Sequence, residues 1–214
     1  MTRGKGKSGL IVLGSQEERH GLLPEDTDTK LAAYVALKAA AATDAKLLGI
    51  VNTATDHGYL KHGRHVHAAL VLEDLKRIIV NTVERLGIKG FVIVNGHGGN
   101  RLITEHLPAL EKLLGVKILF NNAVVEVEGA HAATGECSMA AAAGFCDPSI
   151  AEGQKDFERF PEVGFIGLRE AHVNKRIKEL AEKTKKEGVK IDLELGKRLL
   201  EQAAESVVGD IRRL

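Results

Sequence analysis

The sequence predicts an α/β protein in which helices cover a mostly parallel sheet. Short apolar runs bounded by glycine, such as GLIVLG and GFVIV, are typical of buried strands. These runs alternate along the 214 residues with longer segments whose apolar residues recur at helical spacing. Such alternation favours parallel strands joined by helical crossovers. Because aromatic residues make up only 4% of the chain, we expect an aliphatic core.

The first half of the chain contains two such cycles. GLIVLG predicts the first strand, and a polar loop leads from it to a helix over about residues 29–42, which Asp26, Thr27 or Asp28 could cap. KLLGIVNTA predicts the second strand. A loop rich in glycine and histidine follows it, and then a long helix through AALVLEDLKRIIVNTVERLG.

The second half of the chain begins with the same cycle. GFVIVNGHGGN predicts a third strand with its loop, RLITEHLPALEKLLG a helix, and VKILFNNAVVEV a fourth strand. A segment rich in glycine and alanine, ATGECSMAAAAG, and two charged helical stretches complete the chain. This length fits one domain over residues 1–214.

Charge and hydropathy limit the classes of partner. The 30 basic and 29 acidic residues nearly cancel, which disfavours binding to nucleic acid or to a membrane surface and favours a small-molecule partner. No apolar run approaches the roughly 20 residues that span a bilayer. The basic start, MTRGKGKSG, is typical of a solvated tail rather than a targeting signal. Together with two cysteines that form no CxxC pair, these features predict a cytoplasmic protein.

Titratable residues gather in the segments that follow the predicted strands. Residues beyond the carboxyl ends of parallel strands share one edge of the sheet, where ligands bind. The side chains expected at that edge are His20, Asp28, His57, His62, His65, His67, His97, His131 and Glu136. We therefore expect a ligand site at this edge.

The first and third of these loops suggest a metal site. GSQEERHGLLPEDTD offers several carboxylates and His20, which are ligands that zinc or iron accepts. Asp28 would lie near a helix N-terminus and could bridge two ions with its two oxygens. NGHGGN adds His97, and its glycines let an ion or substrate approach the main chain.

Each loop also has an ordinary interpretation. Acidic loops that contain a histidine are usually solvated, and a glycine cluster after a strand can cradle phosphate instead of metal. Glu136 could be an acid that favours the first turn of a helix. The second loop, GYLKHGRHVH, could place Lys61 and Arg64 on a phosphate or could be a solvated basic loop.

The four segments taken together resemble a known family. GSQEERHGLLPEDTD, TDHGYLKHGRHV, NGHGGN and HAATGECS resemble, in order and spacing, the signatures of the creatininase family of metal-dependent amidohydrolases. The resemblance runs almost from end to end. It implies a three-layer α/β/α sandwich with a mostly parallel sheet.

The resemblance also implies a ligand set. The family's Glu-x-His pair and the Asp that closes an LPxxTD segment match Glu18, His20 and Asp28. Glu18, Asp28 and His97 would hold one ion, and His20 and Asp28 a second. An ungapped alignment would instead put Glu17 at the glutamate position and Arg19 at the histidine position, where it could not bind a cation.

One family ligand has no counterpart at its usual position. Creatininase has a glutamate where this chain has Gly99, so Glu136 is the candidate replacement, either as a ligand or as an acid–base group. His131 occupies the position of a catalytic or substrate-contacting histidine, and we expect it to transfer protons.

GLREA and KKEGVKIDLELGKRLLE favour one branch of the family. That branch hydrolyses the formamide of a phosphorylated ribosylaminopyrimidine in riboflavin and coenzyme F420 biosynthesis. The resemblance implies two divalent ions, with ferrous iron favoured over zinc or manganese, and a homo-oligomer. Lys61 and Arg64 are then the expected phosphate contacts. The alternatives are hydrolysis of another cyclic or linear amide, or a non-enzymatic phosphosugar-binding module.

Overall fold

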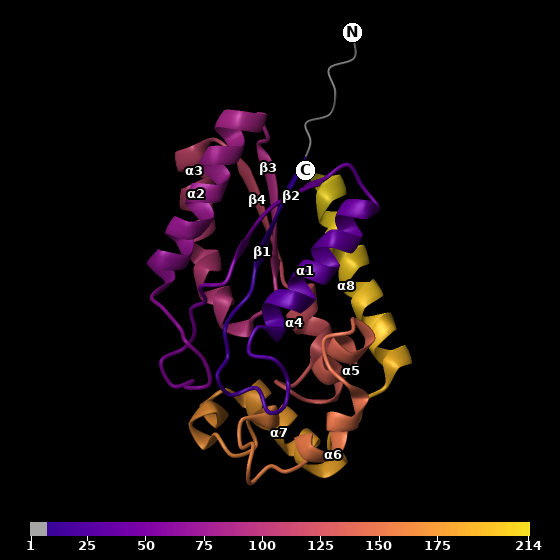
Figure 1. Cartoon of the computed structure of the whole chain (residues 1–214). Coiled ribbons are helices and arrows are strands. Elements are labelled where there is room, and N and C mark those ends of the chain that lie inside the picture. Colours follow the sequence, from indigo (N-terminus) through magenta and orange to yellow (C-terminus); the bar gives the residue numbers. More distant parts are fainter. Residues whose placement is uncertain (1–7) are drawn as a thin grey trace.

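A computed structural model describes residues 8–214, and the first seven residues of the basic N-terminal stretch lie outside this range. Four parallel strands form the sheet in the order β2-β1-β3-β4 (Figure 1). They are β1 (Gly9–Leu13), β2 (Lys46–Val51), β3 (Gly90–Asn95) and β4 (Lys117–Asn121). Parallel order with helical crossovers is the arrangement that the sequence predicted.

Helices cover both faces of the sheet. One face carries α2 (Ala68–Leu86), η1 (Gly98–His106) and α3 (Leu107–Leu114). The other carries α1 (Thr27–Ala41), α4 (Ala123–Glu128), α5 (Thr134–Ala142) and α8 (Leu193–Arg213). The segment between α5 and α8 contains η2 (Pro148–Ile150), α6 (Ala151–Gln154), η3 (Val163–Phe165), η4 (Arg169–Val173) and α7 (Lys175–Glu187). Figure 1 shows this segment beyond the carboxyl ends of the strands.

The central strand β1 separates two apolar cores. Successive side chains of a strand point to opposite faces of the sheet. Leu10 and Val12 accordingly pack toward α1 and α8, while Ile11 and Leu13 pack toward α2 and η1, and all four are fully buried. Because both faces are buried, the strand is a continuous apolar run. The predicted α/β fold with helices on both faces is confirmed.

The fourth strand is shorter than its sequence suggested. The apolar stretch VKILFNNAVVEV predicted a strand throughout, but β4 ends at Asn121 and AVVEVE forms α4. The Asn121 Oδ1 accepts a hydrogen bond from the Ala123 amide and so turns the chain. Val124 is fully buried in the core with α1 and α8. Tertiary packing therefore overrides the strand preference of the valines.

The helix predicted over RLITEHLPALEKLLG is divided. Its first part belongs to η1, and α3 begins at Leu107, with Pro108 in its first turn. Proline has no amide hydrogen and cannot donate to the preceding turn, which accounts for the break. Among residues 8–214, no helix is both long and apolar enough to cross a membrane.

Candidate metal centre

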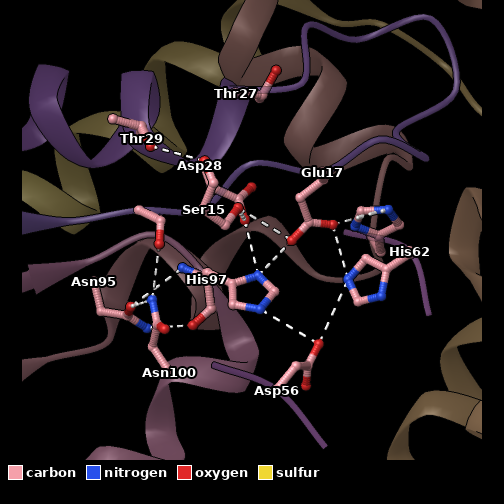
Figure 2. Close-up of polar contacts among 12 residues, drawn as sticks. Ser15, Glu17, Thr27, Asp28, Thr29, Asp56, His62, Asn95, His97 and Asn100 are labelled. Carbon is pink, nitrogen blue, oxygen red and sulfur yellow. Dashed lines mark hydrogen bonds and ion pairs between the residues drawn. The ribbon is translucent and has the colours of Figure 1, made fainter. Parts of the chain in front are cut away.

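The centre is built around His97, which lies two residues beyond the end of β3 (Figure 2). His97 Nδ1 lies 2.6 Å from Glu17 Oε1 and 3.1 Å from Asp28 Oδ2. Ser15 Oγ lies 2.8 Å from Asp28 Oδ2 and 3.2 Å from Glu17 Oε1, so its single hydrogen can be donated to either carboxylate. Glu17 is 0% exposed, and Asp28 and His97 are each 4% exposed. The loop after β1 and the loop after β3 thus converge on one buried cluster.

A network of amides holds the His97 loop in place. Asn100 Nδ2 donates to the Gly14 carbonyl and to Asn95 Oδ1, and Asn95 Nδ2 donates to the His97 carbonyl (Figure 2). Space is equally restricted, because a Cβ at Gly96 would lie 2.2 Å from the Asp28 carbonyl oxygen. Only glycine lets the β3 loop and the start of α1 approach so closely.

The loop after β2 adds three more side chains. His62 Nε2 lies 2.8 Å from Glu17 Oε2, and Asp56 Oδ2 lies 3.4 Å from His97 Nε2. His65 Nε2 lies 3.8 Å from Asp56 Oδ2. The side chains of Asp56 and His62 are each 2% exposed. The hypothesis that this loop is a solvated basic segment therefore does not hold for these residues.

A second cluster lies beside the first. His20 Nε2 is 2.5 Å from Glu136 Oε1 and 4.0 Å from Asp28 Oδ1. Its ring stacks on that of His131, with centroids 4.6 Å apart. Glu136 also accepts the Ala132 amide at 2.6 Å and is 1% exposed. Asp28 therefore has one oxygen near each cluster.

Burial and charge together set the protonation of the first cluster. Burial, together with the negative charge of Glu17, raises the pKa of Asp28 to about 6. Burial opposes protonation of His97, but the charge of Glu17 and hydrogen bonds to Asp28 and Asp56 outweigh it and hold the His97 pKa well above its usual range. The buried carboxylates thus stabilise positive charge at the neighbouring nitrogen.

In the second cluster, too, attraction between opposite charges outweighs the effect of burial on the pKa values. Burial disfavours charge on both His20 and Glu136, yet their mutual attraction raises the pKa of His20 to about 10 and lowers that of Glu136 to about 2. His131 has the opposite shift. Burial and the neighbouring charge of His20 lower its pKa to about 4.

The two clusters fit divalent metal ions. Ligand atoms of Glu17, His62, His65 and His97 lie within 4.8 Å of one another, as do those of His20, His131 and Glu136. Buried ring atoms in both clusters, His62 Nδ1 in the first and His20 Nδ1 in the second, have no hydrogen-bond partner in the described part of the chain. Buried polar atoms without partners are unfavourable, and a cation would satisfy them. Such nitrogen and oxygen donors suit zinc, manganese and ferrous iron.

The structure corrects the expected position of one ligand. Glu18 lies at the surface, where its side chain is 53% exposed and pairs with Arg64, and Glu17 points into the cluster instead. The backbone fixes this choice, because the Glu17 amide donates to the Glu25 carbonyl and the Arg19 amide to the His62 carbonyl. Glu18 and Arg19 consequently face outward, while Glu17 and His20 face inward.

The expected phosphate contacts also lie elsewhere. Arg64 Nε donates to Glu18 Oε1 at 2.5 Å, and the Arg64 side chain is 67% exposed. Lys61 is exposed as well, and neither residue lines the pocket over the two clusters. An arginine already paired with a carboxylate at the surface is a poor candidate for binding a phosphate inside a pocket.

The other predicted residues do come together. His20, Asp28, His97, His131 and Glu136 all lie in the two clusters. The sequence interpretation considered Glu17 but preferred Glu18, it missed Asp56 and Glu128 as members of this region, and it assigned no metal role to His62 or His65. The signal available for Asp56 was its place in TDHG directly after the second predicted strand. No sequence pattern identified Glu128.

Four members of the clusters, Asp28, His62, His97 and His131, line a cavity of about 340 Å³. Glu128 lines it, and burial together with the nearby charges of Glu136 and Asp28 raises the Glu128 pKa well above its usual range. Phe165 also lines the cavity and stacks on His131, with centroids 4.8 Å apart. Its φ of 54° is unusual for a residue other than glycine, and such strain is common at functional sites.

Comparison with known proteins identifies the class to which this site belongs. The model of the creatininase family, described as creatinine amidohydrolase, matches residues 3–211. The chain therefore belongs to the creatininase family. Three solved structures, which share only 15–16% of residues with this chain, support the fold. The first is a creatininase with a Glu-to-Gln substitution in complex with creatine, with a TM-score of 0.66. The second is a zinc form of such a variant and the third a manganese creatininase, each with a TM-score of 0.63. Each alignment covers 97% of this chain, and it covers 91%, 90% and 91% of the three solved chains in that order.

More similar proteins are found within one branch of the family. Over 96% of this chain, proteins from Methanothermobacter marburgensis and Methanosphaera stadtmanae are 46% and 43% identical to it, and 90% of each is covered. A third, from Methanothermus fervidus, is 42% identical over 96% of this chain and 84% of its own length. All three are named 2-amino-5-formylamino-6-ribosylaminopyrimidin-4(3H)-one 5'-monophosphate deformylase.

Proposed function

We propose that this protein is a hydrolase that releases formate from the formylamino group of 2-amino-5-formylamino-6-ribosylaminopyrimidin-4(3H)-one 5'-monophosphate. The other product is the 2,5-diaminopyrimidine ribosyl phosphate, and we assign the step to riboflavin and coenzyme F420 biosynthesis. Relatives named for this deformylation, 46% and 43% identical over 96% of the chain, support the substrate. The observation that carries the chemistry is the pair of buried acid–imidazole clusters that share Asp28.

We propose that these clusters hold two divalent ions. Glu17, Asp28 and His97 would hold one ion, and Asp28, His20 and Glu136 the other. Such ions, when bound, supply a water that ionises near neutral pH and polarise the formyl oxygen. Ferrous iron is preferred from the family resemblance, while the same donors also suit zinc and manganese.

His131 is the candidate for proton transfer. Burial lowers its pKa, which leaves the ring neutral at pH 7 and able to accept a proton. His131 Nε2 lies 3.0 Å from the Arg19 carbonyl oxygen, which favours the tautomer that carries its hydrogen at Nε2. Nδ1 is then the accepting nitrogen, and it can pass the proton to the departing amine. Glu136, which His20 keeps ionised, is better suited to binding a cation than to donating a proton.

The test is a direct assay of formate release by protein purified without oxygen, with its metal content measured in the same preparation. We expect formate from the formylaminopyrimidine phosphate and no ring opening of creatinine. Hydrolysis of creatinine without release of formate would replace this proposal with the other amidohydrolase activity of the family.

A variant separates binding of metal from proton transfer. His131→Ala is expected to keep its metal and to lose about 10²- to 10⁴-fold in turnover, the usual contribution of a general acid–base group. Loss of metal from this variant would show that His131 is a ligand. Unchanged turnover would remove it from the mechanism.

A further inference from the structure

The pocket over the two clusters differs in chemical character between its floor and its mouth. Its floor contains the buried groups Asp28, His62 and His97. Arg101 and Arg176 also line the pocket, but both are exposed to solvent. A ligand in this pocket would therefore meet acids and imidazoles at one end and guanidinium groups at the other.

The two arginines reach the pocket from separate elements. Arg101 belongs to η1, one helical turn beyond His97, and Arg176 lies in the first turn of α7. Figure 1 shows α7 beyond the carboxyl ends of the strands, the edge at which His97 lies. The segment between α5 and α8, which follows the core strands in the sequence, thus supplies one side of the pocket.

Neither arginine is neutralised by the protein. Arg64, Arg77 and Arg213 each pair with a carboxylate, whereas Arg101 and Arg176 enter no ion pair within residues 8–214. A guanidinium carries five N–H donors in a planar fork that matches phosphate oxygens. Asn174 lines the same part of the pocket, and its Oδ1 is already used by the amides of Arg176 and Ile177, which orders this turn.

Electrostatics fixes the direction in which a phosphorylated ligand would bind. A phosphomonoester carries about −1.5 to −2 charges at pH 7 and is repelled by like charges. The carboxyl groups of Asp28, Asp56 and Glu128 line the floor and offer a phosphate no cationic side chain, whereas the unpaired guanidinium groups at the mouth attract it. Val125, Phe165 and Leu180 provide an apolar wall for the ring system. The formylamino end then faces the clusters while the ribose phosphate extends to the mouth.

We propose that Arg101 and Arg176 together bind the 5'-phosphate of the substrate and set the specificity of the pocket for phosphorylated ligands. This inference rests on the proposed function for the identity of the substrate. The positions of the two arginines and their lack of a carboxylate partner in the described chain carry it. They replace Lys61 and Arg64, which the structure places outside the pocket.

The experiment compares one substrate with and without its phosphate. Arg101→Ala and Arg176→Ala are each expected to lower kcat/KM for the phosphorylated substrate by about 10-fold or more, through KM, because each loses charged hydrogen bonds to the phosphate. Activity on the dephosphorylated nucleoside is expected to stay unchanged. Arg64→Ala, an exposed arginine outside the pocket, is the matched control and should retain wild-type values with both substrates.

Equal losses with both substrates, or no loss with either, would overturn the assignment. Calorimetric titration with ribose 5-phosphate distinguishes its failure from failure of the proposed function. If the wild-type protein releases no formate but binds ribose 5-phosphate, and the double variant does not, then the proposed reaction is wrong and the phosphate site stands. If the wild-type protein and the double variant bind this probe equally, or neither binds it, the phosphate site is wrong whatever the reaction.

Discussion

Glu17 and Glu18 are adjacent residues of the same type with opposite environments. Glu17 is fully buried between His97 and His62, whereas Glu18 pairs with Arg64 in solvent. The family pattern placed the ligand at Glu18 because one intervening residue separates the family's glutamate and histidine. In this chain two residues, both facing outward, separate Glu17 from His20. Sequence spacing could not show which of the two side chains points inward, since hydrogen bonds to Glu25 and His62 determine it.

This difference gives a matched pair of variants. Glu17→Gln keeps the size of the side chain but removes the charge, and we expect it to lose metal and nearly all activity. Glu18→Gln should keep both, since exposed ion pairs contribute little, about 0–1 kcal/mol. Elemental analysis of both purified variants measures this directly. If Glu17→Gln keeps its full metal content and Glu18→Gln loses its metal, then Glu18 is the ligand, as the Glu-x-His spacing of the family implied.

Protonation of His20 predicts a pH dependence of metal binding. Only the neutral ring binds a metal ion, so binding displaces a proton from a residue whose pKa in the metal-free protein is about 10. Below that pH, the neutral fraction rises about tenfold per pH unit, and metal affinity should therefore rise with pH from 6.5 to 8.5. Calorimetry in two buffers of different ionisation enthalpy counts the protons. We expect at least one proton released at pH 7; identical heats in both buffers would contradict this.

At the scale of elements, the regular parts were predictable and the irregular parts were not. GLIVL and FVIVN are short apolar runs between glycine or polar residues, so their strands could be recognised without tertiary information. AVVEVE has the composition of a strand but becomes α4 because its valines pack against α1 and α8. The loop residues could be assigned to one sheet edge by topology, but their mutual orientation depends on side-chain hydrogen bonds that no local pattern encodes.

The crossing of α5 and α8 depends on a glycine. A Cβ at Gly196 would lie 1.9 Å from the Ser138 carbonyl oxygen, while one at Gly209, also in α8, would meet nothing within 4 Å. Gly196→Ala should therefore destabilise the protein by about 2 kcal/mol through overpacking. Gly209→Ala should stabilise it by about 1 kcal/mol, because alanine favours the helix. Chemical denaturation measures the free energy of unfolding of both variants. Equal changes in this free energy would contradict the prediction, because they would show that α5 and α8 can move apart to accept the Cβ.

At the scale of the whole molecule, the two clusters join elements that are distant in sequence. Glu136 follows His20 by 116 positions, yet the two side chains are in contact. An ion held between such segments stabilises the folded state, because the unfolded chain does not keep its ligands together. Metal binding is thus expected to contribute to stability as well as to chemistry.

Removal of metal should therefore lower the thermal midpoint. At a free metal concentration of about 100 times Kd, binding to the folded state contributes about 2.7 kcal/mol. For a protein of this size, that corresponds to a shift of about 5–10 °C. Calorimetric scans before and after chelation, and again after metal is restored, measure the shift. A thermal midpoint that does not change on chelation would contradict this expectation, because it would mean that the folded protein is as stable with protonated clusters as with metal-bound clusters.

Phe165, whose ring lies against His131 and His62 in a left-handed backbone conformation, offers an optical reporter. The natural chain contains no tryptophan. An indole introduced at this position would be the single such fluorophore of the molecule, placed in contact with imidazoles. Its emission would follow the occupancy of the neighbouring cavity in real time without an added label, and excitation at wavelengths that tyrosine does not absorb would leave out the two native tyrosines.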